Sequence, residues 1–469
     1  MKSFNYLGVW WLPSQGEQKF PGEITFLENE QATLILGGTF SHNQPGPIEF
    51  SNYPIIWGTT EDGQPITLLH CQEVGFKLAE EQEEKYLVDV VFIGVYVADQ
   101  EQIRFATVDV HYTYLAQWAG VFPYRGLQQP FAEVKALTTK GIITVQPLID
   151  VWQRLLKQTD VIGEAKLPEL VRIRCEVQEA LSLDEWTTRY IAPIQHFISL
   201  ATQRPNALFH LVGYLLQESA ENVAGNNLGV PVQIAFSPAI VPIQAGRSTT
   251  PKSILFTLQE TAPNFSSIID IWLSMADELN SAFRLFFGVL YTNLPLDLQF
   301  LLLAQAAEVY QDFRFDKTPL TEEEFQNVVT VLQAACPDPQ KEWLENVLRY
   351  SNGATFSQQV KNLITNTYII LDPLLGKNSA KRGDFSRIVY NTRNYLTHHS
   401  KELALNAANG IELLFIIRCL SVILQVCFMR DIGFTDQQIT QIFHKKHESY
   451  RLALFLQQQV HLEKLISHS

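Results

Sequence analysis

Arg393, His398 and His399 lie close together in an otherwise apolar region near the C-terminus. Arginine stays charged at any physiological pH and suits a phosphate, whereas histidine, with an ordinary pKa of about 6.5, exchanges a proton near neutral pH. A neutral His398 can accept the proton of a ribose 2′-hydroxyl as that oxygen attacks phosphorus, while Arg393 offsets the charge that builds on the phosphate. The pair therefore predicts metal-independent RNA cleavage to a 2′,3′-cyclic phosphate, a reaction that DNA resists.

The spacing of the two groups limits how they can meet. Five positions on an unbroken α-helix turn the chain by about 140°, so Arg393 and His398 do not share a face. Convergence requires the helix to bend or end near Thr397, or requires two facing subunits. The structural alternative is that both residues cap carbonyls or pair with carboxylates, and a string of this kind is also common by chance.

The net charge of −14 disfavours a protein that coats nucleic acid, because Lys and Arg supply most non-specific affinity for phosphates. The charge balance reverses around the candidate pair, because residues 377–401 contain six basic residues and one acidic residue, Asp384. The basic residues are Lys377, Lys381, Arg382, Arg387, Arg393 and Lys401. We interpret this basic island as a local RNA contact, with a solvated basic face as the commoner alternative.

Composition narrows the class of protein. The chain has 469 residues, 46% apolar and 18% charged, so we expect it to be folded throughout, in two or three domains. Five cysteines without a CxxC pair argue against disulfides and a zinc knuckle, and no signal peptide is evident, so we expect a cytoplasmic protein without a metal or cofactor.

Two other features have structural interpretations. His444 and His447 are interpreted as parts of a solvated basic helix. The apolar run 413–429 contains Arg418 and is interpreted as a buried helix rather than a membrane span.

Two patterns divide the chain. Residues 5–150 consist of β-rich runs separated by turn residues, and residues 168–260 mix strand-like pieces with one helical piece. After Pro263, apolar residues recur at helical spacing. We therefore predict an α+β multidomain fold. Its parts are an N-terminal antiparallel β-rich domain at 1–262, with a sub-boundary near 150–168, and an all-α helical bundle at 263–469.

Tryptophan and glycine landmarks occur in a characteristic order in the N-terminal half. They are Gly8–Pro13, Pro21–Phe26, Trp57–Gly63, Ile66–Leu69 and Tyr114–Trp118. By these landmarks, the N-terminal half resembles the domain that precedes an ApeA-like HEPN domain in bacterial anti-phage proteins. The string from Arg393 to His398, inside a helical region, is similar to the Arg-x4-6-His motif of HEPN domains.

The resemblance implies an endoribonuclease of abortive infection, built as an HEPN dimer whose two motifs form one composite cleft. It implies that Arg393 and His398 are the catalytic pair. Asn394 then occupies the motif's polar position, with Tyr395 beside it as a supporting residue. His399 also fits the motif with a longer gap, so the choice of base between His398 and His399 is open.

Glu308 resembles a recurring acidic position of this HEPN class, with outward-facing helix packing as its structural alternative. The partners that the resemblance implies are RNA, with tRNA as one candidate, a second copy of the chain, and a phage-derived trigger at the N-terminal domain.

Two other classes of protein stay open from the sequence. One is a non-catalytic HEPN-type module that binds RNA or protein and uses the motif for dimer contacts. The other is a small-molecule receptor whose β domain lines a pocket with tryptophans, although core packing is their commoner role. The tryptophans concerned are Trp10, Trp11, Trp57 and Trp118.

Overall fold

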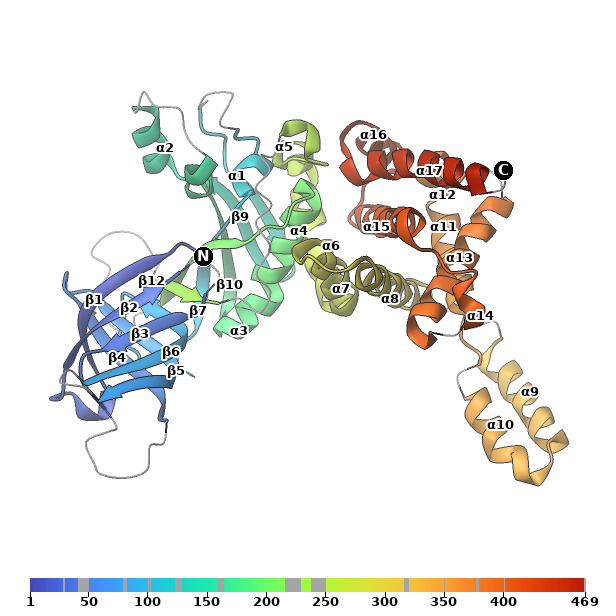
Figure 1. Cartoon of the computed structure of the whole chain (residues 1–469). Helices are drawn as coiled ribbons and strands as arrows, with labels where there is room; N and C mark the ends of the chain where they lie inside the picture. Colours follow the sequence, from blue (N-terminus) through green and yellow to red (C-terminus); the bar gives the residue numbers. More distant parts are fainter. Residues whose placement is uncertain are drawn as a thin grey trace. The chain divides into compact units, whose positions relative to one another are not determined.

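The computed structural model describes residues 1–27, 30–40, 50–78, 82–99, 101, 103–122, 129–157, 164–215, 229–237, 250–315, 320–349, 351–376, 379–399 and 401–467. The chain separates into two units, Met1–Leu273 and Ser274–Ser469 (Figure 1). Their border lies inside helix α6 (Phe265–Glu278), because the first turns of α6 pack in the N-terminal unit: Trp272 Nε1 donates to Pro193 O at 2.7 Å. The N-terminal unit is rich in antiparallel strands and the C-terminal unit is helical, which confirms the predicted fold class.

Twelve strands among the described residues form one antiparallel sheet in the N-terminal unit. They are β1 (Phe4–Trp11), β2 (Phe20–Phe26), β3 (Ala32–Leu36), β4 (Asn52–Thr60), β5 (Pro65–Leu78), β6 (Gln82–Ile93), β7 (Phe105–Tyr112), β8 (Val134–Thr138), β9 (Gly141–Pro147), β10 (Val171–Leu181), β11 (Leu208–Leu215) and β12 (Val230–Phe236). The pairing of β3 with β6 closes β1 to β6 into a barrel. From β6 the sheet continues in the order β12, β11, β7, β10, β9, β8, so β9 and β10 pair across residues 148–170.

The barrel is packed around Trp10, whose side chain is completely buried. A Cβ atom added to Gly58 would lie 2.1 Å from the Trp10 ring, and one added to Gly22 would lie 2.9 Å from it. Only glycine leaves room for the indole at these strand positions. The landmark residues Trp10, Gly22 and Gly58 are therefore packing residues of the barrel.

Helices cover the open part of the sheet. They are α1 (Leu115–Trp118), α2 (Ile149–Leu156), α3 (Leu183–Trp186), α4 (Ala192–Thr202), α5 (Leu258–Thr261) and the start of α6. Phe197 of α4 lies at the centre of the packing, because its ring contacts those of Trp118, Phe256 and Trp272. Of the tryptophans considered as pocket residues, Trp11 and Trp118 are buried like Trp10, and Trp57 Nε1 donates to Val97 O at 2.8 Å. All four serve packing.

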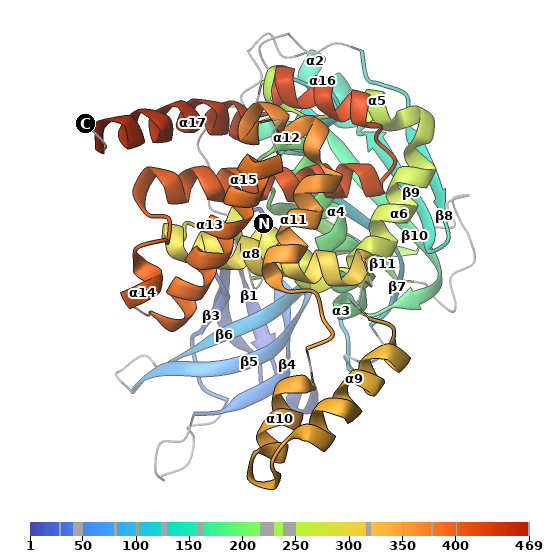
Figure 2. The same ribbon diagram turned by 90° about the vertical axis from the view of Figure 1, so that its right-hand side faces the viewer.

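The C-terminal unit consists of helices. They are α7 (Asn280–Tyr291), α8 (Leu296–Arg314), α9 (Glu322–Ala335), α10 (Lys341–Leu348), α11 (Phe356–Asn366), α12 (Tyr368–Leu375), α13 (Ser379–His398), α14 (Lys401–Ala404), α15 (Gly410–Asp431), α16 (Asp436–Lys446) and α17 (Glu448–Ser467). Phe428 of α15 packs against Phe283, Phe286 and Tyr310, so α15 joins α7 and α8 in one core. Figures 1 and 2 both show α11 beside α13 in this bundle.

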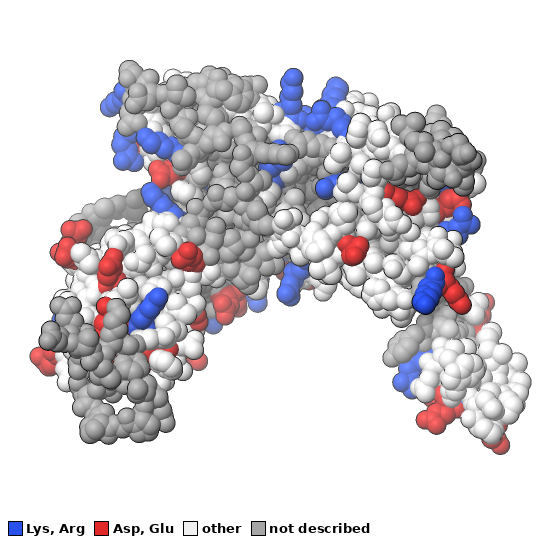
Figure 3. Space-filling view, viewed as in Figure 1, with Lys and Arg blue, Asp and Glu red and all other residues white. Residues whose placement is uncertain are grey.

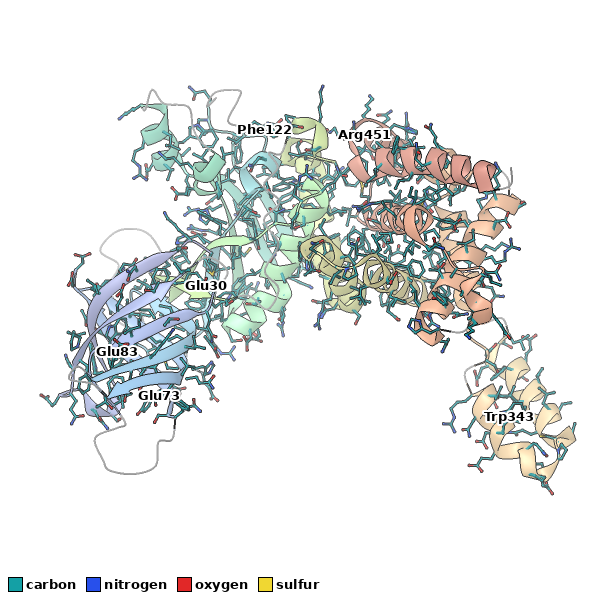
Figure 4. All side chains as sticks on the ribbon, in the orientation of Figure 1. Glu30, Glu73, Glu83, Phe122, Trp343 and Arg451 are labelled. Atoms are coloured by element: carbon teal, nitrogen blue, oxygen red, sulfur yellow. The ribbon has the colours of Figure 1, made fainter. Side chains whose placement is uncertain are left out.

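Helices α9 and α10 form a hairpin that buries none of its helical residues. Trp343 of α10, labelled in Figure 4, is 65% exposed, and Val331 of α9 is 68% exposed. The hairpin therefore presents apolar side chains to solvent instead of adding to the core of the bundle.

Helix α15 is the one helix of the described residues that is long and apolar enough to cross a membrane. Inside the bundle, however, 72% of its most apolar window is buried. This confirms the interpretation of residues 413–429 as a buried helix.

The interpretation of His447 as part of a solvated helix is wrong. Helix α16 ends at Lys446, and the side chain of His447 is completely buried between α16 and α17. Its Nδ1 accepts the backbone N–H of Tyr450 at 3.0 Å, so Nε2 carries the proton and donates to Gln425 Oε1 at 2.5 Å. Burial lowers the pKa of His447 to about 3. A neutral imidazole thus caps the first turn of α17.

Candidate active site

Helix α13 carries the candidate residues and is held by its buried stripe. Phe385, Ser386, Val389 and Thr392 recur at helical spacing and are buried. Ser386 Oγ donates to Ser357 O at 2.7 Å, which links α13 to α11. The helix is therefore fixed in rotation about its own axis before it reaches the motif.

Thr392 anchors the helix immediately before Arg393. Its hydroxyl donates to Ile388 O at 2.7 Å and accepts the backbone N–H of Ala408 at 2.9 Å. Both Thr392 and Ala408 are buried. The contact ties the end of α13 to the segment that leads into α15, and thereby sets the position of the neighbouring Arg393.

Arg393 is half-buried and packs its guanidinium over Phe356 of α11, with Cζ 5.8 Å from the ring centroid. Its Nη1 lies 3.4 Å from Asn394 Oδ1, a long contact. Across the described residues, no carboxylate lies within ion-pair distance of Arg393. The guanidinium is therefore oriented by stacking and keeps most of its donors available for an anion.

Glu308 of α8 lies close enough to feel the charge of Arg393. Burial raises the pKa of the Glu308 carboxyl, Arg393 lowers it, Asp312 raises it, and the net shift is upward. Asp312 in turn accepts a hydrogen bond from the Gln359 side chain of α11. Glu308 is half-buried, and it supplies negative potential next to Arg393 without forming an ion pair with it.

His398 is the last residue of α13 and is exposed. The helix ends there because His399 adopts a left-handed conformation with φ of 51°, and its N–H donates to Tyr395 O at 2.6 Å. The helix thus ends close to Thr397, which is one of the two conditions under which the motif residues could converge. The His399 ring packs edge-on against Tyr395, with centroids 5.7 Å apart, whereas no hydrogen bond or ion pair within the described ranges involves the His398 ring.

The two motif residues do not meet within one chain. No hydrogen bond between described residues joins Arg393 to His398, and their helical positions differ by about 140°. Residues eleven positions apart do share a face, since they differ by only about 20°. Arg382 therefore lies on the face of Arg393, and Arg387 lies on the face of His398.

The basic island around the motif is only partly engaged. Arg387 pairs with Asp384 at 2.8 Å, and the Arg382 Cζ lies 5.8 Å from the Tyr368 ring centroid. Lys381 and Lys401 are exposed, and Lys377 lies outside the described residues. In the part of the chain that the structure describes, no three His, Cys, Asp or Glu side chains gather as a metal site.

Comparison with known families decides the relationship of the chain. Residues 5–272 match the ApeA N-terminal domain 1, and residues 301–438 match the Apea-like HEPN domain. The chain belongs to the ApeA-like HEPN family. The HEPN match includes Glu308, Arg393 and His398 and indicates a nuclease-type, anti-phage function. No curated protein and no solved structure gives a significant match.

The sequence did not reveal the roles of two residues at this candidate site. Phe356 stacks against Arg393, and Thr392 anchors the end of α13 to Ala408. Phe356 follows the capping box that Thr355 forms with Gln358 at the start of α11. A capping box of this kind predicts the start of a helix from the sequence. Nothing in the sequence, however, indicates that the first aromatic residue of α11 faces Arg393.

Proposed function

We propose that this protein is an endoribonuclease of anti-phage abortive infection, acting in the cytoplasm on RNA, with tRNA as one candidate substrate. The observation that carries the proposal is that the last turns of one helix carry both groups. Arg393 is stacked on Phe356 with no carboxylate of the described residues at ion-pair distance, and His398 is exposed. Membership of the ApeA-like HEPN family supports it.

The chemistry follows from these two side chains. The neutral His398 accepts the proton of the ribose 2′-hydroxyl, and O2′ forms a bond to phosphorus while the bond from phosphorus to O5′ breaks. Arg393 binds the phosphate oxygens, and the departing O5′ takes up a proton from solvent. The nucleophile belongs to the RNA, so no metal is needed to generate it. His398 is preferred over His399 as the base, because the His399 ring packs on Tyr395.

The separation of Arg393 and His398 around α13 favours a site built by two subunits. In a symmetric dimer, Arg393 of one protomer faces His398 of its partner, so that each composite cleft contains both groups. The positive surface on which the RNA backbone lies is extended by Arg382, Arg387, Lys381 and Lys401.

The barrel is acidic and does not compete for RNA. Residues 1–93 contain 13 acidic and 4 basic residues, which gives a net charge of −9. Figure 3 shows acidic side chains spread over the barrel. The role of the N-terminal unit in this proposal is to sense a phage-derived trigger.

The test is to incubate the full chain with tRNA and mRNA in EDTA, beside a variant with Arg393→Ala and His398→Ala. We expect fragments that end in a 2′,3′-cyclic phosphate from the wild type only. If both proteins bind RNA and neither cuts it, the chain is the non-catalytic binding module. The separation of the two motif residues within one chain is the observation that favours this second function.

A further inference from the structure

A cavity of about 310 Å³ opens on one face of the sheet in the N-terminal unit. Strands β7 and β11 supply Asp109, His111, His210 and Tyr214, and β10 supplies Arg172. The strand register explains this gathering, because Asp109 pairs with Arg174 on one side and His111 pairs with His210 on the other. Side chains of strand neighbours on one face lie side by side.

The floor of the cavity is built on one buried carboxylate that binds two guanidinium groups. The Asp109 carboxylate, 3% exposed, accepts hydrogen bonds from Arg172 Nη1 at 2.9 Å, from Arg174 Nε and Nη2 at 2.7 Å, and from the Tyr214 hydroxyl at 2.7 Å. Asp109 thus binds both guanidinium groups, of which Arg172 lines the cavity, whereas Arg174 lies outside the lining and also feels the charge of Glu176. At the rim, Lys2 and Glu169 pair with each other at 2.8 Å and add no net charge.

Arg172 keeps a donor for a ligand. Its Nε donates to Gln146 Oε1 at 3.0 Å and its Nη1 donates to Asp109, whereas no hydrogen bond to a described residue uses its Nη2. The Arg172 side chain is 25% exposed and lines the cavity. A guanidinium held by two partners and open at the third nitrogen is a preorganised anion site.

The neutral aromatic rings of His111, His210 and Phe209 line the cavity together with the Arg172 guanidinium. His111 Nδ1 lies 3.1 Å from Pro168 O, which can only accept, so Nδ1 carries the proton and Nε2 is an unprotonated acceptor. Burial is the main reason that the pKa of His111 falls to about 4, which keeps the ring neutral. The His210 ring lies edge-on to it, with centroids 5.4 Å apart, and Phe209 also lines the cavity.

We propose that this cavity binds a small organic anion that carries a planar heteroaromatic ring, of the size of a nucleoside monophosphate. The anionic group binds Arg172 Nη2, and a ring N–H or exocyclic amino N–H of the base donates to His111 Nε2 while the ring packs against His210 and Phe209. The volume lies at the lower end of the range for small-molecule sites, about 300–1,000 Å³. The proposal concerns the N-terminal unit alone and does not depend on ribonuclease activity.

Isothermal titration of the full chain with AMP, GMP, CMP and UMP tests this proposal. We expect at least one of the four to bind, and the corresponding nucleoside and ribose 5-phosphate to bind at least tenfold more weakly, because each offers only half of the contacts. Val151 of α2 lines the cavity, so Val151→Trp should fill it and abolish binding. Ile149→Trp is the matched control, because Ile149 lies on the same helix and is already 45% exposed.

His111→Phe removes the Nε2 acceptor and keeps an aromatic ring of similar shape, so we expect it to weaken binding of the nucleotide about tenfold. Thermal unfolding of each variant shows whether it is folded. The proposal is overturned if none of the four nucleotides binds, or if a folded Val151→Trp variant binds as tightly as the wild type.

Discussion

Thr392 accepts the backbone N–H of Ala408 through its hydroxyl at 2.9 Å, and this bond joins the end of α13 to the segment that leads into α15. Both residues are buried, so the hydroxyl has no water to replace it if it is removed. Arg393, the next residue along the helix, takes its position from this anchor.

Thr392→Val should destabilise the protein by about 1–3 kcal/mol, because it leaves the buried Ala408 N–H without an acceptor while keeping the shape of the side chain. Urea unfolding followed by circular dichroism measures the change. Thr397→Val is the control, because Thr397 is exposed and, among the described residues, its hydroxyl donates within its own helix, to Arg393 O. Equal effects of the two substitutions would contradict the anchoring role of Thr392.

His398→Ala should lower the rate of RNA cleavage by about 10²- to 10⁴-fold, the range for loss of a general base. His399→Ala should have a much smaller effect, because the His399 ring packs on Tyr395 and does not serve as the base. Single-turnover cleavage of a labelled tRNA gives both rates. A larger loss in the His399 variant would transfer the role of base to that residue.

Arg393→Ala and His398→Ala subunits, mixed after separate purification, should regain activity. In each mixed dimer one composite cleft contains an intact Arg393 from one protomer and an intact His398 from its partner. Random exchange makes half of the dimers mixed, so about a quarter of the wild-type clefts are restored in a two-fold symmetric assembly. Mixtures that stay as inactive as the two parent variants would show that both groups must come from the same chain.

Acid should destabilise the helical unit through His447. Burial lowers the pKa of the folded imidazole to about 3, so below about pH 6.5 the unfolded chain binds a proton that the folded chain does not. The free energy of unfolding therefore falls as the pH drops, by about 2 kcal/mol at pH 5 for this one group. The loss is complete only near the folded pKa.

His447→Asn isolates this effect, because asparagine still caps a helix but does not titrate. Hydrogen exchange at the Tyr450 amide, which donates to His447 Nδ1, reports local opening of α17 between pH 7 and pH 5. We expect a weaker pH dependence in the variant. The same slope in both proteins would mean that His447 does not control acid stability.

The sequence by itself determined the order of β-rich and helical regions, and it singled out Arg393 and His398 as a candidate pair on one helix. It could do so because alternation, helical spacing and polar interruptions are encoded over a few neighbouring residues. The end of α13 at His398 is of this kind, since the residues that stop the helix adjoin it. His447 shows where such local patterns mislead. It follows His444 at helical spacing, but His444 lies within α16, whereas His447 comes after the end of α16 and caps α17.

Only the tertiary structure decided what surrounds each of these groups. Arg393 stacks on Phe356, Trp10 lies against Gly58, and Asp109 collects Arg172 and Arg174. These partners are tens of residues apart in the sequence, and no short-range pattern pairs them. They meet because closing the barrel and packing the bundle bring distant segments together, and the free energy that selects those contacts comes from burying the whole core.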